Sequence, residues 1–207
     1  MISSAGVNLV QLRAYLVQNN LALAISRNVT TRDDNDQQQP YRLQVGISGT
    51  HTITGSGKLY SVTFMQLFQA DQLRGLGGTL NPLPGRRALA QPLHDPVAMA
   101  ANIPNAAGPA GSMLLANDGS IAAFVPARRA LTWQLTDANG LPVVRERMWV
   151  SFQPGEIRVC TSCHALNDKD QAGNTAPTNP PQALDTMMQY WKAQLPSPKL
   201  YLPFLVK

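Results

Sequence analysis

The sequence predicts a mainly β protein, a small β-sandwich-like domain with long irregular loops and one helix near the C-terminus. The composition favours this class over a helix bundle, because charged residues make up only 14% of the 207 positions while proline (16) and glycine (15) are frequent. The pattern agrees, since short apolar runs alternate with turn residues, as they do in β-sandwiches. A hydrophobic content of 44% is enough for a buried core.

The length fits one domain or two small ones. We expect a β-rich N-terminal segment over residues 1–76 and a β-sandwich domain with a C-terminal helix over residues 77–207, with one continuous domain as the alternative. The strands expected in the first segment are residues 7–10, 21–25, 41–47 and 60–64, and residues 65–76 continue as strand or as helix.

Residues 77–111 are rich in glycine, proline, alanine and asparagine and show little periodicity. A long irregular stretch inside a compact domain is unusual unless it has a function, such as wrapping a ligand. His94 lies in its middle, in the sequence Pro92-Leu93-His94-Asp95-Pro96. The flanking prolines predict that this segment is extended and stiff.

The second half of the chain shows clearer elements. The turn Asn117-Asp118-Gly119 between residues 112–116 and 121–125 predicts a hairpin. Further strands are expected at residues 131–135, 143–152 and 157–159. Pro180-Pro181 opens a helix to about Leu195, whose apolar residues recur at helical spacing: Leu184, Met187, Met188, Trp191 and Leu195.

Residues 160–164 read Cys-Thr-Ser-Cys-His, and Cys160 and Cys163 are the only cysteines of the chain. This string is the attachment signature of a c-type haem. Two thiols at this spacing add to the two vinyl groups on one edge of the porphyrin, and His164 then lies under the iron as its proximal ligand. We therefore predict a monohaem c-type cytochrome with one covalently attached haem c, held by Cys160, Cys163 and His164.

Three other interpretations of the cysteines compete with haem. A zinc site would need two further ligands, and there is no second cysteine pair. A thioredoxin-like dithiol should follow a strand in a βαβ pattern, whereas residues 153–156 upstream form a turn. A simple disulfide across two residues is the plainest alternative.

The sixth iron ligand has several candidates. We expect His94 to be the distal ligand, with Asp95 beside it to accept the ring N–H and raise the ligand's basicity. A methionine, His51 or an open site are the alternatives. Two imidazoles would keep the reduction potential low, a methionine thioether would raise it, and an open site would permit small-molecule binding.

The methionines differ in their claims to the iron. Met99 shares the irregular loop with His94. The others fit core packing better, because they lie in expected strands or on the apolar face of the C-terminal helix. These are Met65, Met113, Met148, Met187 and Met188.

The formal net charge is +5, with Arg86-Arg87 and Arg128-Arg129 the densest basic positions. No run of lysine and arginine is interleaved with aromatic residues, which disfavours nucleic-acid binding. A basic surface near a haem edge would attract an acidic redox partner, although an ordinary solvated surface is the plainer explanation. Candidates to pair with the haem propionates, or else plain surface residues, are Arg128, Arg129, Arg145, Arg147 and Arg158.

No stretch of 18 or more apolar residues predicts a transmembrane helix. The start, Met1 to Gly6, lacks the charged region and apolar core of a signal peptide. Haem c is attached outside the bacterial cytoplasm, so we expect a periplasmic or extracellular protein. Either a leader has been removed or these residues are one piece of a longer exported chain, and we favour the second explanation.

An ordered series of short motifs runs through the second half: Asp118-Gly119-Ser120, Val125-Pro126-Ala127, Trp133-Gln134-Leu135, residues 137–140, Trp149, Pro154-Gly155-Glu156 and Cys160 to His164. Over about residues 105–180 this series resembles the C-terminal haem domain of the hydrazine synthase alpha-subunit family. The resemblance implies a small β-sandwich with the haem site at its end. It also implies a haem held by two histidines, with His94 matching the distal one.

The larger members of that family carry a β-propeller and a second haem upstream, which do not fit within residues 1–104. The resemblance therefore implies the electron-transferring module and not the active site that makes hydrazine. We expect redox proteins or subunits of a multihaem complex as partners. The alternatives are a haem enzyme with an open iron that acts on a small nitrogen or oxygen species, and an accessory subunit of a redox complex.

Overall fold

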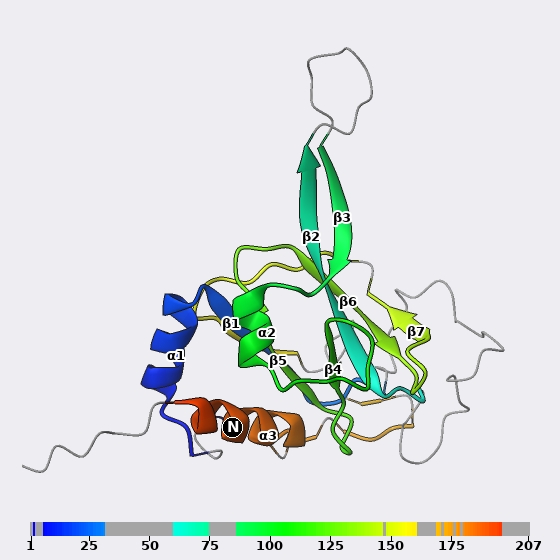
Figure 1. The fold of residues 1–207 in the computed structure, drawn as a ribbon. Coiled ribbons are helices and arrows are strands. Elements are labelled where there is room, and N and C mark those ends of the chain that lie inside the picture. The colour runs from blue at the N-terminus through cyan, green and yellow to red at the C-terminus, as the bar shows by residue number, and fades with distance from the viewer. Residues whose placement is uncertain are drawn as a thin grey trace, which may run out of the picture.

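The computed structural model describes residues 2, 6–31, 60–74, 86–146, 148–160, 169–170, 172–175, 177–178 and 180–195. Within them, two β-sheets and three helices form the fold (Figure 1). The predicted mainly β class with a C-terminal helix is confirmed. Strands from both of the expected segments pair with one another in both sheets.

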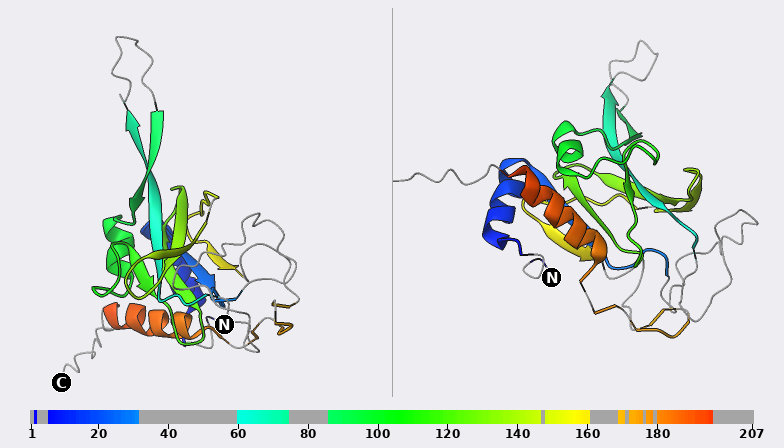
Figure 2. Two further views of the ribbon diagram at one scale, coloured as in Figure 1. Left: turned by 90° about the vertical axis from the view of Figure 1, so that its right-hand side faces the viewer. Right: turned by 60° about the horizontal axis from the view of Figure 1, so that its bottom comes forward.

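The smaller sheet has three strands, in the order β5 (Ile121–Pro126), β1 (Leu21–Ser26) and β8 (Ile157–Cys160). The central strand β1 pairs antiparallel with β5 and parallel with β8. On one side of this sheet lie α1 (Leu9–Gln18) and α3 (Gln182–Gln194), as the right-hand view of Figure 2 shows. The strand that leads to Cys160 is therefore an edge strand on a sheet backed by helices.

The larger sheet contains β2 (Phe64–Arg74), β3 (Arg86–Pro92), β4 (Ser112–Leu114), β6 (Leu131–Thr136) and β7 (Pro142–Arg145). Its strand order is β3-β2-β6-β7, and β4 pairs with the start of β2. Pairing of β2 with β6 ends at Gln69 and Leu131, whereas β2 and β3 continue to Arg74 and Arg86. Beyond Gln69 these two strands therefore project from the body as a two-stranded arm (Figure 1).

One buried apolar cluster joins both sheets and all three helices. At its helical side the ring of Tyr15 meets Phe124 and Trp191 edge-on, with centroids 6.1 and 5.5 Å apart. Trp191 is 2% exposed and Phe124 fully buried. Each large apolar side chain buried in this way contributes about 1.5–3 kcal/mol to folding.

The first expected strand, residues 7–10, is wrong, because α1 begins there. Asn8 caps this helix: its side-chain oxygen accepts hydrogen bonds from the backbone N–H groups of Val10 and Gln11 at 2.9 and 3.2 Å. Leu12 and Leu16, one helical turn apart, are fully buried. The cap and the packing together override the β preference of the valines.

The expected hairpin is also wrong, although its turn is present. Gly119 donates a hydrogen bond to the carbonyl of Ala116 at 2.9 Å, but β4 then pairs with β2 in one sheet and β5 with β1 in the other. Gly119 has φ +78°, and a Cβ there would collide with the side chain of Asn28. Only glycine suits this turn.

The stretch 77–111 is less irregular than expected, because its described part contains β3 and the helix α2 (Pro96–Ala101). Pro96 starts the helix instead of extending the chain, and Asp95 caps it through Val97 and Ala98. The expected strand at 143–152 is shorter, since β7 ends at Arg145. The strand expected at residues 41–47 lies outside the described residues.

Candidate functional site

Cys160 is the last residue of β8, at the point where the chain leaves the smaller sheet. Its Cα pairs with that of Ser26 in β1, and its carbonyl oxygen accepts a hydrogen bond from the backbone N–H of Arg27 at 3.4 Å. The thiol is free and the residue half-buried. Cys163 and His164, the other residues of the predicted attachment motif, lie outside the described residues.

The electrostatic environment keeps the Cys160 thiol neutral. Burial raises its pKa, the positive charge of Arg158 opposes this rise, and the negative charge of Glu146 adds to it. Reactive redox cysteines need the opposite, a thiol pKa lowered by a helix N-terminus or a nearby cation. The raised pKa disfavours the dithiol redox interpretation, whereas the position of Cys160 at the end of β8 is also the one that such a dithiol would take.

Arg158 of β8 contacts the end of the preceding segment. It donates a hydrogen bond to the carbonyl of Ser151 at 3.1 Å, and its guanidinium lies 4.4 Å from the centroid of the Phe152 ring. Arg158 and Cys160 share one face of β8, because side chains alternate along a strand. Three large apolar residues in the sequence before the motif are exposed: Met148 (64%), Trp149 (45%) and Val159 (38%).

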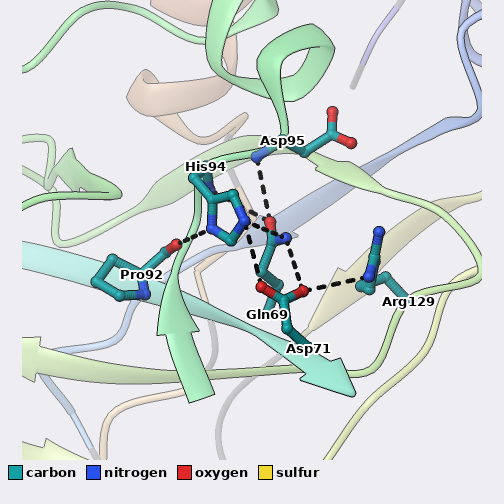
Figure 3. Close-up of polar contacts among 6 residues, drawn as sticks. All are labelled: Gln69, Asp71, Pro92, His94, Asp95 and Arg129. Atoms are coloured by element: carbon teal, nitrogen blue, oxygen red, sulfur yellow. Dashed lines mark hydrogen bonds and ion pairs between the residues drawn. The ribbon is translucent and has the colours of Figure 1, made fainter. Parts of the chain in front are cut away.

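His94 lies elsewhere, in a polar cluster at the base of the arm (Figure 3). Its Nδ1 is 2.8 Å from the carbonyl of Pro92, so this nitrogen carries the hydrogen and donates it. Its Nε2 is 3.2 Å from the side-chain nitrogen of Gln69 and 3.3 Å from Oδ2 of Asp71. The ring N–H is thus held by Pro92 and not by Asp95, whose side chain caps α2.

Gln69 organises this cluster and is only 2% exposed. Its Oε1 accepts hydrogen bonds from the backbone N–H groups of His94 and Asp95 at 3.3 and 3.2 Å. Its Nε2 donates to Oδ1 of Asp71 at 3.2 Å. Buried and fully paired, the amide fixes the segment that leads from β3 into α2.

The structure does not bring His94 and Cys160 together. Asn102, at the end of α2, exchanges two hydrogen bonds with the backbone of Phe124, at 2.7 and 2.8 Å, along the edge of β5 that faces away from β1. Beyond β5 come β1 and then β8 with Cys160, two strand spacings of about 4.8 Å each. The distal role of His94 stays a prediction, which the described geometry does not support within one chain. His51 lies outside the described residues.

The methionines mostly fill the core, as expected. Met148 is the exception, because it lies outside any strand and is 64% exposed, with its N–H bonded to Glu146 at 2.8 Å. Met99 is 39% exposed on α2. The buried ones are Met65 (6%), Met113 (4%), Met187 (3%) and Met188 (0%). Among the described methionines that sequence reasoning assigned to the core, Met148 is thus the one that is exposed instead.

Three of the five arginines predicted to meet propionates are already paired within the chain. The pairs are Arg129 with Asp71 at 3.2 Å, Arg145 with Gln134 at 2.9 Å and Arg158 with Glu156 at 2.7 Å. Of the other two arginines, Arg128 is exposed and has φ +57°, and Arg147 lies outside the described residues.

Sequence reasoning missed Arg27, whose backbone N–H donates to the carbonyl of Cys160 and whose partly buried side chain donates to the carbonyl of Pro177. No motif marks this arginine, because only the pairing of β1 with β8 brings it to the site. The described residues contain no group of three or more His, Cys, Asp or Glu side chains that could hold a metal ion. They also contain no helix with the length and apolarity to cross a membrane.

Comparison with known proteins bears on the same region. Residues 81–165 match the family model described as hydrazine synthase alpha subunit middle domain. This part of the chain is similar to that domain. The match supports the resemblance at the level of the family, but it points to the middle domain of the alpha subunit and not to a C-terminal haem domain. It extends through Cys160 and residues 161–165.

Among solved structures, the hydrazine synthase of Kuenenia stuttgartiensis aligns with 80% of this chain at 16% sequence identity and a TM-score of 0.43. The chain spans 20% of the length of that protein. A search of the curated proteins finds no match.

Proposed function

We propose that this chain is a haem c module that transfers electrons within a larger extracytoplasmic redox assembly. One haem would be attached through Cys160 and Cys163, with His164 as its proximal ligand. The observation that carries the proposal is the position of this motif. It begins at the end of β8 with a half-buried free thiol.

The residues around Cys160 fit such a group. A bound porphyrin would bury apolar surface, and exposed apolar side chains stand in the sequence before the motif, at Met148, Trp149 and Val159. The neutral thiol of Cys160 suits a structural thioether anchor better than a thiolate nucleophile. Two buried polar atoms beside Cys160, Oγ of Ser26 and Nε of Arg27, have no hydrogen-bond partner. When bound, haem supplies a one-electron iron couple, and these residues anchor it and shield it from water.

Partners follow from the comparison. The matched family model describes a domain of the alpha subunit of a synthase. This supports a role beside other subunits or domains. Because c-type haem is attached outside the bacterial cytoplasm, we place the protein in the periplasm or outside the cell.

A second candidate function is a haem enzyme with an open iron site that acts on a small nitrogen or oxygen species. One observation favours it: the cluster with Gln69 and Asp71 holds His94 away from Cys160, so this histidine is not poised as a second axial ligand. A thioether ligand, for which the exposed Met148 is available, would give a closed site instead. The spectrum of the ferric protein separates the two.

The test is to produce the chain in a bacterial periplasm together with a haem c maturation system. We expect a pyridine haemochrome spectrum and an intact mass that correspond to one covalently bound haem. A Cys160→Ser, Cys163→Ser double variant should lose covalent haem while it keeps the far-ultraviolet circular dichroism of the wild type. A low-spin ferric spectrum supports electron transfer, whereas a high-spin spectrum that shifts with nitric oxide supports the enzyme. If the wild-type protein carries no covalent haem, both the electron-transfer function and the enzyme function are ruled out.

A further inference from the structure

A cavity of about 240 Å³ opens between α3, β4 and the loop that follows α2. None of its described lining residues belongs to β8 or to the cluster around His94. Met113, Ala122 and Met187 are buried, whereas Leu114 is exposed, so the cavity reaches from the core to the surface. Its apolar wall includes Ile103, Met113, Leu114, Leu115, Ala122 and Met187.

The character of this wall selects a neutral ligand with a ring. The described residues that line the cavity carry no charge, and a charged ligand would lose its hydration there without an opposite charge to replace it. Met113 and Met187 contribute flexible thioethers, which pack favourably against aromatic rings. An apolar cavity of about 150 Å³ is enough to hold benzene. The volume here therefore fits one substituted ring.

Asn105 is one of the two polar side chains at this cavity, and its orientation is fixed. Its Nδ2 donates to the hydroxyl and to the carbonyl of Ser112, at 3.0 and 3.4 Å. Gly108 permits this approach, because a Cβ there would collide with Oγ of Ser112 and with Nδ2 of Asn105. Since Nδ2 is engaged within the chain, the atom that Asn105 offers to a ligand is the acceptor Oδ1.

The other polar side chain at the cavity is that of Thr186. Its hydroxyl donates to the carbonyl of Gln182 at 3.1 Å, so its hydrogen is engaged as well. Pro104, which also lines the cavity, has no backbone N–H to offer. Asn105 and Thr186 thus present acceptor oxygens, and a ligand has to supply the donor.

We infer that this cavity binds a small neutral aromatic molecule that carries one O–H or N–H donor, as phenol does. The ring would pack against Met113 and Met187, and its donor would bond to Oδ1 of Asn105. The inference goes beyond the proposed function and does not depend on haem, because the cavity shares no described residue with the attachment motif.

The experiment follows the methionine methyl groups of the full chain by nuclear magnetic resonance during titration with phenol, toluene and benzoate. Phenol should shift the signals of Met113 and Met187 and leave those of Met99 and Met148, which do not line the cavity. Phenol should bind about fivefold more tightly than toluene, the usual net effect of one hydrogen bond. Benzoate should not bind, because its charge would be buried without a partner.

Three variants locate the ligand. Ala183→Leu places a larger side chain in the cavity and should abolish the binding of phenol. Ala14→Leu, the same change at an exposed position of α1, is the matched control and should leave binding unchanged. Asn105→Ala should bring the affinity for phenol down to that for toluene. The ratio of the two affinities reports on the acceptor even if this variant alters the shape of the cavity.

Several results would overturn the inference. Absence of shifts at Met113 and Met187, or retained binding of phenol in folded Ala183→Leu, would show that the cavity is not the site. If Ala183→Leu fails to fold by circular dichroism, the methyl shifts of the wild type decide alone. Equal affinities for phenol and toluene would contradict the role of Asn105. Tighter binding of N-acetyltyrosine amide than of phenol would assign the cavity to a partner's side chain and not to a small molecule. The proposed function stands in each case.

Discussion

Oδ2 of Asp118 accepts a hydrogen bond from the backbone N–H of Gln182 at 2.9 Å, although the two residues are 64 positions apart. Beside it, the hydroxyl of Ser120 accepts from the N–H of Ala183 at 3.0 Å. Helix α3 has Pro181 as its N-cap residue and therefore no side-chain cap of its own. The turn between β4 and β5 supplies the missing cap and fixes α3 against the smaller sheet.

Replacing this cap should loosen α3. Asp118→Ala should lower the free energy of unfolding by about 1 kcal/mol, the usual effect of losing an N-cap acceptor. Urea unfolding followed by the fluorescence of Trp191 in α3, in a variant that lacks the other two tryptophans, measures it. Asp118→Asn, which keeps one oxygen acceptor, is the control. Equal stability of Asp118→Ala and the wild type would show that the contact contributes nothing.

Gln69 should matter more for stability than His94, which it holds. Gln69→Leu leaves the N–H groups of His94 and Asp95 without their acceptor, and each unsatisfied buried donor costs about 1–3 kcal/mol. His94→Ala removes only a half-exposed ring. We expect chemical denaturation to give a clearly lower free energy of unfolding for Gln69→Leu than for His94→Ala. The reverse ranking would contradict the role given to the amide.

The spectrum of haem-loaded His94→Ala tests the distal ligand. Because α2 and β5 separate His94 from Cys160, we expect its ferric absorption and paramagnetic resonance spectra to equal those of the wild type. Met148→Leu, a swap of similar volume, is the companion variant. Loss of a bis-imidazole signature in His94→Ala alone would restore this histidine as the ligand and require a rearranged chain.

The haem-free protein should show a late-titrating thiol. Because burial raises the pKa of Cys160, its alkylation by iodoacetamide should stay slow through neutral pH and accelerate only above the ordinary thiol value of about 8.5. The same shift stabilises the fold fully below that value, and this stability is lost as the pH rises through the raised pKa. Cys163→Ser isolates the signal of Cys160. Fast alkylation at neutral pH in the folded protein would contradict the raised pKa.

A buried relay joins three strands of the larger sheet. Arg145 donates to Gln134, Gln134 donates to Gln66 at 2.7 Å, and Gln66 donates to the carbonyl of Ala110 at 2.9 Å. Gln134→Leu breaks this relay in the middle and leaves the Gln66 oxygen unsatisfied, so we expect the free energy of unfolding to fall by about 1–3 kcal/mol. Arg145→Ala, at the exposed end, should lower the free energy of unfolding by less. Thermal unfolding of the two variants checks the order.

The sequence predicted best what depends on local patterns. Helix α3 was predicted because its buried residues Leu184, Met187, Met188 and Trp191 recur at helical spacing. Helix α1 was missed because β-favouring valines surround its start, and burial of Leu12 and Leu16 decides it. The turn at Gly119 was predicted correctly, but its flanking strands pair with β1 and β2 from distant parts of the chain.

The candidate site likewise combines residues that a local pattern predicts with residues that only long-range pairing brings together. The spacing of Cys160, Cys163 and His164 is itself the chemical requirement for haem attachment, so a single sequence is enough to predict this site, and it stays a prediction. Arg27 becomes a site residue only because β1 pairs in parallel with β8, which no local pattern encodes. The assignment of His94 relied on family resemblance, and tertiary contacts with Gln69 and Asp71 decide where its ring lies.

The edge position of β8 has a consequence for assembly. Among the described strands, β8 pairs with β1 alone, whereas β1 is also held by β5 through six paired residues. Release of β8 breaks one short ladder and leaves β1 and β5 paired. Cys160 can therefore leave the sheet with β8 while the rest of the body stays folded. On the proposed function, covalent attachment at Cys160 would then require the opening of this one ladder and not the unfolding of the domain.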